Sequence, residues 1–114
     1  MELWIDDVRP APTAEYIWAR SVEDAKAFIM AREAFKGLLW RFANGLDERI
    51  WPFELIDIDH DAGDYAVDGG DYIKLLDWLE ETGRNYPIRI HSMNPVGVAN
   101  MRAIIQRNGW VEVR

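Results

Sequence analysis

Alternating short apolar strands and helical stretches place this 114-residue chain in the α/β class. Two observations predict that class. Apolar runs at residues 3–5, 53–59 and 87–91 have strand length, and the stretches that follow the later two carry apolar residues at helical spacing. Parallel strands need long crossover connections, so this alternation predicts a mainly parallel sheet covered by helices on both faces.

The first strand, residues 3–5, ends at Asp6-Asp7. Two prolines in the following turn, Pro10 and Pro12, preclude a helix or a strand ladder there. We therefore expect no regular helix between Asp7 and Glu15, so that a loop joins the first strand to the second, residues 16–19.

Capping signals define the helices. Ser21 and Asp24 resemble a capping box, and they open a helix that we expect to end near Asn44-Gly45. A second helix is predicted over residues 71–81. Asn94-Pro95 opens a third helix that runs to Gly109, and a last strand follows at residues 110–113. We expect a single domain over residues 1–114 with an insertion within residues 32–51, most favourably at 41–51.

Composition excludes several classes of function. No cysteine is present, so there is no disulfide, thiolate metal site or thiol nucleophile. The net charge of -7 argues against binding duplex nucleic acid, which needs a basic face. No signal sequence and no membrane-spanning apolar segment is recognisable, so we expect a cytoplasmic protein without a membrane partner.

Ionisable residues gather where three of the predicted strands end. Because the carboxyl ends of parallel strands share one edge of a sheet, where ligands bind, we expect these side chains to lie close together. They are Asp6 and Asp7, then Asp59, His60 and Asp61, then His91 with Ser92. Carboxylates suit Mg²⁺ or Mn²⁺, and an imidazole favours a transition metal. The helix opened by Asn94 adds backbone amides that can face a phosphate.

Structural interpretations of the same residues stay open. Asp6 and Asp7 could be ordinary turn residues, the Asp59-His60-Asp61 run a solvated loop, and His91 a buried histidine bonded to backbone. Asp57 lies two positions before Asp59, on the same face of the strand. It could extend the acidic site or contact the insertion.

Three segments resemble the receiver domains of bacterial response regulators: IDD, FELIDID and DGGDYIKLLDWL. The resemblance implies a flavodoxin-like three-layer sandwich with a five-stranded sheet in the order 2-1-3-4-5. It also puts Asp59 at the phosphoacceptor position, Asp6-Asp7 at the acid pair that holds Mg²⁺, and Ser92 near the conserved hydroxyl. Two features depart from that pattern. The last strand, WVEVR, lacks the receiver lysine, and VRPAP replaces the first helix.

A closer resemblance is to the cyclic-phosphate processing receiver domain family, carried by LWIDDVRPAP, IDHDAGD and HSMNPVGVANM. It implies a metal-dependent phosphoesterase acting on cyclic phosphate ends of RNA or nucleotides. The expected ligands of Mg²⁺ or Mn²⁺ are Asp6, Asp7, Asp59 and Asp61. His60 and His91 would act as general base and general acid beside Asp59, and the substrate would contact Arg9, Ser92 and Asn94.

Two other functions remain open. One is an inactive receiver-like module that senses a nucleotide or docks a protein partner, with Trp40 and Trp51 on the docking face. The other is a working phosphotransfer receiver in which Asp59 accepts the phosphate. The missing lysine and helix make the phosphotransfer role the least favoured.

Overall fold

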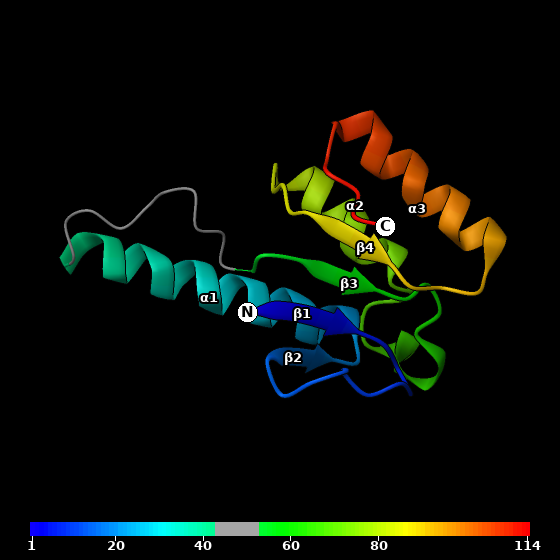
Figure 1. Ribbon diagram of the computed structural model, residues 1–114, viewed down its shortest axis with the longest axis horizontal. Helices are drawn as coiled ribbons and strands as arrows, with labels where there is room; N and C mark the ends of the chain where they lie inside the picture. The colour runs from blue at the N-terminus through cyan, green and yellow to red at the C-terminus, as the bar shows by residue number, and fades with distance from the viewer. Residues whose placement is uncertain (43–52) are drawn as a thin grey trace.

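Four parallel strands form the centre of the computed structural model, which describes residues 1–42 and 53–114 (Figure 1). They are β1 (Glu2–Ile5), β2 (Tyr16–Ala19), β3 (Ile56–Ile58) and β4 (Ile88–Ile90). Their order in the sheet is β2-β1-β3-β4, and every neighbouring pair is parallel. The α/β class and the four predicted strand positions are therefore confirmed.

Three α-helices and one short 3₁₀ helix complete the described part of the chain. They are α1 (Val22–Phe42), η1 (Gly63–Val67), α2 (Ile73–Glu81) and α3 (Pro95–Asn108). Both predicted N-caps are confirmed, since Ser21 Oγ accepts from the Asp24 amide and Asn94 Oδ1 from the Gly97 amide, each at 3.0 Å. The end of α1 expected near Asn44-Gly45, and most of the expected insertion at 41–51, lie outside the described residues.

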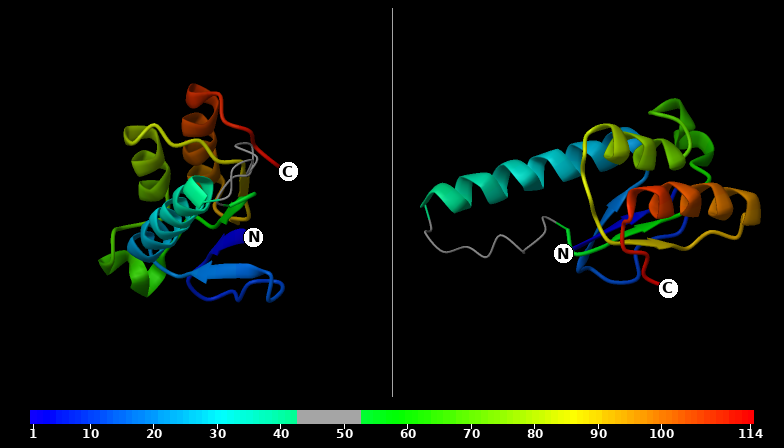
Figure 2. Two further views of the ribbon diagram at one scale, coloured as in Figure 1. Left: turned by 90° about the vertical axis from the view of Figure 1, so that its left-hand side faces the viewer. Right: turned by 90° about the horizontal axis from the view of Figure 1, so that it is seen from above.

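The connection between β1 and β2 contains no regular helix, as the two prolines predict. This loop has a consequence for the whole architecture. The crossovers through α1 and α2 run in the same direction along the sheet, and right-handed crossovers in one direction lie on one face. Figure 2 (left) shows α1, α2 and α3 together on one side of the strands. The expectation of a three-layer sandwich is therefore wrong for the described residues, because the helix that would cover the other face is replaced by a loop.

The expected fifth strand is also wrong as a full strand. Within the described residues, segment 110–113 forms a single parallel bridge, between Ile88 and Glu112. The Ile88 amide donates to Val111 O at 3.0 Å and the Val113 amide donates to Ile88 O at 2.8 Å. The segment thus lies at the position that a fifth strand would take, next to β4, but it pairs around one residue only.

The two faces of the sheet differ in chemistry. The helix-covered face contributes fully buried aliphatic side chains to the core, among them Leu3, Ile5, Ile56, Ile58 and Ile88. The alternate residues point to the other face, which the β1–β2 loop partly covers. That second face carries the side chains described next. No helix in the described part of the chain is both long and apolar enough to cross a membrane.

Candidate functional site

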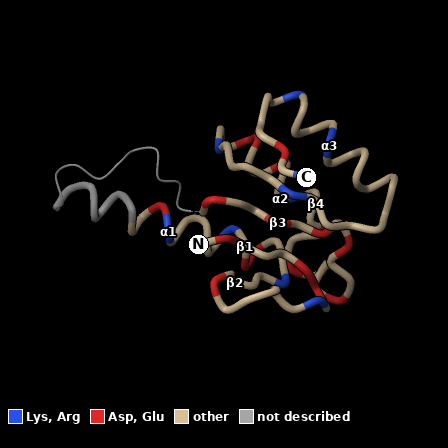
Figure 3. Tube along the Cα trace, in the orientation of Figure 1, with Lys and Arg blue, Asp and Glu red and all other residues tan. Residues whose placement is uncertain are grey.

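Three strands each deliver one ionisable side chain to the carboxyl edge of the sheet. Asp6 follows β1, Asp59 follows β3 and His91 follows β4. One ligand atom from each of these residues lies within 4.8 Å of the others. Figure 3 shows acidic segments of the chain gathered around this edge. The expectation that strand ends bring these residues together is confirmed for this group of three, which we call the Asp6–Asp59–His91 cluster.

The Asp6 carboxylate is almost fully buried, with 1% of the residue exposed. Its Oδ1 accepts from the amides of Val8 and Arg9, at 3.0 and 2.8 Å, and its Oδ2 lies 3.0 Å from His91 Nε2. Burial alone would raise the pKa of Asp6, but the hydrogen bonds from Arg9, Val8 and His91 hold it below its ordinary value. Asp6 is therefore an ionised group that both ends β1 and organises the turn after it.

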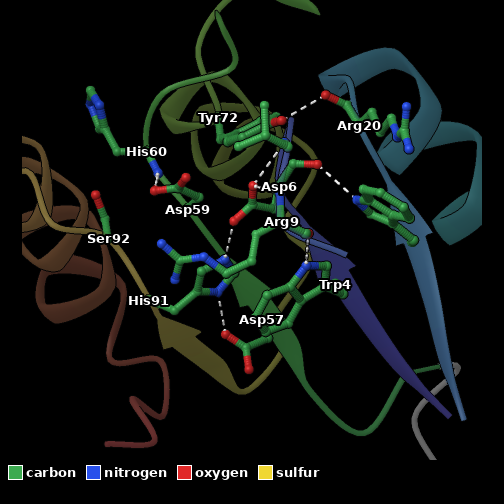
Figure 4. Close-up of polar contacts among 12 residues, drawn as sticks. Trp4, Asp6, Arg9, Arg20, Asp57, Asp59, His60, Tyr72, His91 and Ser92 are labelled. Atoms are coloured by element: carbon green, nitrogen blue, oxygen red, sulfur yellow. Dashed lines mark hydrogen bonds and ion pairs between the residues drawn. The ribbon is translucent and has the colours of Figure 1, made fainter. Parts of the chain in front are cut away.

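His91 is held from three directions (Figure 4). Its Nδ1 lies 2.6 Å from Asp57 Oδ1, and its Nε2 faces Asp6. The Trp4 indole stacks on the imidazole, with ring centroids 3.9 Å apart and planes inclined by 5°. Because both ring nitrogens face carboxylates, a hydrogen on either nitrogen has an acceptor.

Strand register explains how these side chains meet. Trp4 pairs with Asp57, and Asp57 pairs with Arg89, across three adjacent strands. His91 comes two residues after Arg89 and therefore lies on the same face of the sheet, one step nearer the edge. Of the two roles left open for Asp57, the structure shows the first: this carboxylate contacts His91 and extends the acidic site, whereas most of the expected insertion lies outside the described residues.

Asp7 lies beside the cluster but outside it. Burial raises the pKa of Asp7, and the negative charges of Asp6 and Asp59 raise it further. The Asp7 carboxylate packs against Gly63, where an added Cβ would overlap its Oδ2 and the backbone φ is +55°. Glycine at position 63 thus leaves room for the Asp7 carboxylate at the first residue of η1.

The second histidine lies on a different side of Asp59. His60 Nδ1 is 2.9 Å from Asp61 Oδ1 and 3.5 Å from Asn94 Nδ2. Its ring packs on Gly97 in the first turn of α3, where a Cβ would overlap the imidazole. In Figure 4 the His60 ring points away from Asp6 and His91. The structure therefore does not bring His60 or Asp61 into the Asp6–Asp59–His91 cluster.

An open pocket of about 500 Å³ adjoins the cluster. It is lined by Arg9, Asp59, Asp61, Ser92, Met93, Asn94 and Pro95. The three residues expected to bind substrate, Arg9, Ser92 and Asn94, thus share one pocket. Asp59 belongs to both the pocket and the cluster, so it connects the buried charges with the open space.

The Asp6–Asp59–His91 cluster fits a divalent cation by its donor chemistry. Two carboxylates and one imidazole are a donor set that Mn²⁺ and other first-row metals accept, and carboxylate oxygens suit Mg²⁺. The ligand atoms converge without any rearrangement of the backbone. The expected ligands Asp7 and Asp61 are not part of this convergent set, whereas His91, expected to be catalytic, is.

A family model matches this chain over residues 1–107 and describes a cyclic-phosphate processing receiver domain. The chain belongs to the cyclic-phosphate processing receiver domain family. Searches of curated proteins and of solved structures each found no match. In this cyclic-phosphate processing receiver domain, sequence reasoning missed Trp4 as a site residue. The alternation along β1 and β3 could have indicated it, since Trp4 and Asp57 lie on the same face as the acids at the strand ends.

Proposed function

We propose that this domain is a metal-dependent phosphoesterase that opens a cyclic phosphate on a nucleotide or an RNA end. One observation carries the proposal. Asp59 belongs at once to the Asp6–Asp59–His91 cluster and to the pocket lined by Arg9, Ser92 and Asn94. The family description, cyclic-phosphate processing, supports the same class of substrate.

The charges of the residues that line the pocket indicate that a phosphate binds there together with a cation. Its lining carries the cation Arg9 and the two carboxylates Asp59 and Asp61, so the lining alone repels a phosphate. A divalent ion on Asp6, Asp59 and His91 would reverse that balance, polarise a phosphoryl oxygen and make a nearby water more acidic. The chain itself then supplies the hydrogen bonds that orient the phosphate, from the Arg9 guanidinium, the Ser92 hydroxyl and the Asn94 amide.

We assign proton transfer to His60, because the two side chains that its ring contacts, Asp61 and Asn94, line the pocket. Its Nδ1 can donate to Asp61 Oδ1, 2.9 Å away, which leaves Nε2 to carry the proton that moves. In the reaction a water oxygen forms a bond to phosphorus and one phosphorus–oxygen bond to the ribose breaks. His60 donates its proton to the ribose oxygen that leaves, and the proton of the attacking water restores it. His91 keeps its place between Asp57 and Asp6 throughout.

Turnover tests the proposal directly. Wild-type protein with Mn²⁺ should convert a nucleoside 2′,3′-cyclic phosphate into the monoester, and chelation of the metal should stop the reaction. Asp59→Asn should be inactive, whereas Asp24→Asn, an exposed acid of α1, should keep full activity. Equal rates in wild type and Asp59→Asn would contradict the assigned site.

A binding module is the second candidate, and one observation favours it. His91 lies within hydrogen-bond distance of both Asp6 and Asp57, so both buried carboxylates have a partner within the protein itself. A module of this kind would bind a cyclic nucleotide in the same pocket, or present it to a protein partner, without breaking a bond. Binding without turnover, at every divalent metal tested, would support this candidate over the enzyme.

A further inference from the structure

We propose that Asp57 is a positioning residue, which fixes the His91 ring so that Nε2 faces the cation position formed with Asp6 and Asp59. The inference rests on the proposed metal-dependent function, but it concerns cation binding rather than turnover. Neither the family description nor the expected ligand set gives Asp57 a role.

The contact between the two side chains is short and excluded from water. Asp57 Oδ1 lies 2.6 Å from His91 Nδ1, and only 3% of Asp57 is exposed. A carboxylate is costly to bury unless it is paired, so its place inside the sheet face needs a partner of this kind. His91 provides that partner.

The other oxygen of Asp57 is also engaged. Arg89 Nη1 lies 3.4 Å from Asp57 Oδ2, and Arg89 is the direct neighbour of Asp57 in the pairing of β3 with β4. The carboxylate is therefore fixed on both sides. Because one oxygen is held by Arg89, the other is directed towards His91.

Trp4 removes the remaining freedom of the ring. An imidazole held by one hydrogen bond can still rotate about it, but the parallel indole at 3.9 Å sets the plane of the His91 ring. Trp4 is itself anchored, since its Nε1 donates to Arg9 O at 2.8 Å. Asp57 and Trp4 together determine both the position and the plane of the imidazole.

These contacts determine which ring nitrogen of His91 carries the hydrogen and which one faces the cation position. When Nδ1 donates its hydrogen to Asp57, the ring nitrogen available as a ligand is Nε2, which lies 3.0 Å from Asp6 Oδ2. A carboxylate that accepts from the far nitrogen of a histidine in this way orients the ring and makes it a better ligand. Removing such a carboxylate typically lowers metal affinity by about 10- to 100-fold.

The test measures the affinity for Mn²⁺ alone, by calorimetry, in folded proteins that carry no substrate. Asp57→Leu should weaken Mn²⁺ binding by about 10- to 100-fold. Asp57→Asn keeps an acceptor for Nδ1 while removing the charge, so it should recover most of the lost affinity. Equal affinities for wild type and Asp57→Leu would overturn the proposal. An Asp57→Asn protein as weak as Asp57→Leu would also overturn it, because the effect would then come from charge alone.

A second measurement does not depend on whether Asp57→Leu folds. Nitrogen-15 spectra of the wild type loaded with Mg²⁺ should show the His91 hydrogen on Nδ1 and none on Nε2. The opposite tautomer would overturn the inference.

The failure of this inference and that of the proposed function are distinguishable. Turnover that persists with unchanged Mn²⁺ affinity in Asp57→Leu contradicts only the role of Asp57, whereas Mn²⁺ binding without any turnover contradicts only the phosphoesterase.

Discussion

Trp4 lies parallel to His91, with the two ring centroids 3.9 Å apart. The two residues are far apart in the sequence, and they meet because β1 and β4 flank β3 and both side chains lie on the sheet face opposite α1, α2 and α3. The indole shields one face of the imidazole and leaves its two nitrogens to Asp57 and Asp6. Stacking and contacts with two carboxylates thus hold the imidazole in one position and one plane.

Two substitutions of Trp4 separate its contacts. Trp4→Phe keeps an aromatic ring against His91 but loses the hydrogen bond to Arg9 O, so it should lower the free energy of unfolding by about 1 kcal/mol. Trp4→Ala also loses the ring, and should cost about 3–5 kcal/mol. Urea denaturation measures both. Similar losses in the two variants would show that the stacking contributes nothing.

Gly97→Ala should destabilise the protein, although alanine normally favours a helix by about 0.8–1 kcal/mol over glycine. The reason is that a Cβ at position 97 would overlap the His60 ring. The matched control is the same substitution in a His60→Ala background, where the overlap is gone and alanine should stabilise α3. Free energies of unfolding from urea denaturation form a double-mutant cycle, which gives the coupling energy between positions 60 and 97. Additive effects of the two substitutions would exclude the steric contact.

Divalent metal should raise the melting temperature by mass action, and the two neighbouring acids should differ in their effect. Asp59 belongs to the Asp6–Asp59–His91 cluster, whereas Asp61 pairs with His60. Asp59→Asn should therefore abolish most of the rise caused by millimolar Mn²⁺, and Asp61→Asn should preserve it. Thermal melts with and without Mn²⁺ measure this. If Asp61→Asn abolished the rise and Asp59→Asn preserved it, the cation would bind at Asp61 in the pocket and not at the Asp6–Asp59–His91 cluster.

Low pH should weaken the ion pairs that Glu112 forms in the C-terminal segment 110–113. Glu112 accepts from Arg102 Nε at 2.7 Å and from Arg114 Nε at 2.8 Å, and the hydrogen bond from Arg102 is the main cause that lowers the pKa of Glu112. A lowered pKa in the folded state means that the stabilisation is complete above the ordinary glutamate pKa and is lost as the pH falls through the folded value.

As the pH falls below about 5, the free energy of unfolding should decrease less in Glu112→Gln than in wild type. Denaturation at several pH values measures the two slopes. The exposed Glu15, replaced by Gln, serves as the control and should leave the slope unchanged. Parallel curves for wild type and Glu112→Gln would show that the ion pair does not stabilise the folded state.

The sequence predicts which residues lie at the carboxyl edge of the sheet better than it predicts which side chains meet on its faces. Strand ends are local features, and since parallel strands end at one edge, Asp6, Asp59 and His91 could be placed together without knowing any contact. The contact of Asp57 with His91 could not be predicted, because it depends on the register between β3 and β4. That register is set by tertiary packing, which a single strand does not encode.

The errors in architecture have related causes. A three-layer sandwich follows from strand–helix alternation, but the prolines between β1 and β2 remove the helix that would cover the second face. Segment 110–113 has the composition of a strand, yet Glu112 turns to Arg102 on α3 and the segment pairs at one residue. The direction of the His60 ring depends on its fit against Gly97, a contact across the fold.

Phosphorus-31 spectra of a nucleoside 2′,3′-cyclic phosphate incubated with the protein and Mn²⁺ test the central claim most directly. Wild type should convert the cyclic phosphate to the monoester. His60→Gln should have a kcat lower by about 10²- to 10⁴-fold with a KM within a few-fold of wild type, because His60 transfers the proton while Arg9, Ser92 and Asn94 hold the phosphate. A cyclic phosphate that binds to the wild type and stays intact with every divalent metal tried would contradict the proposed phosphoesterase.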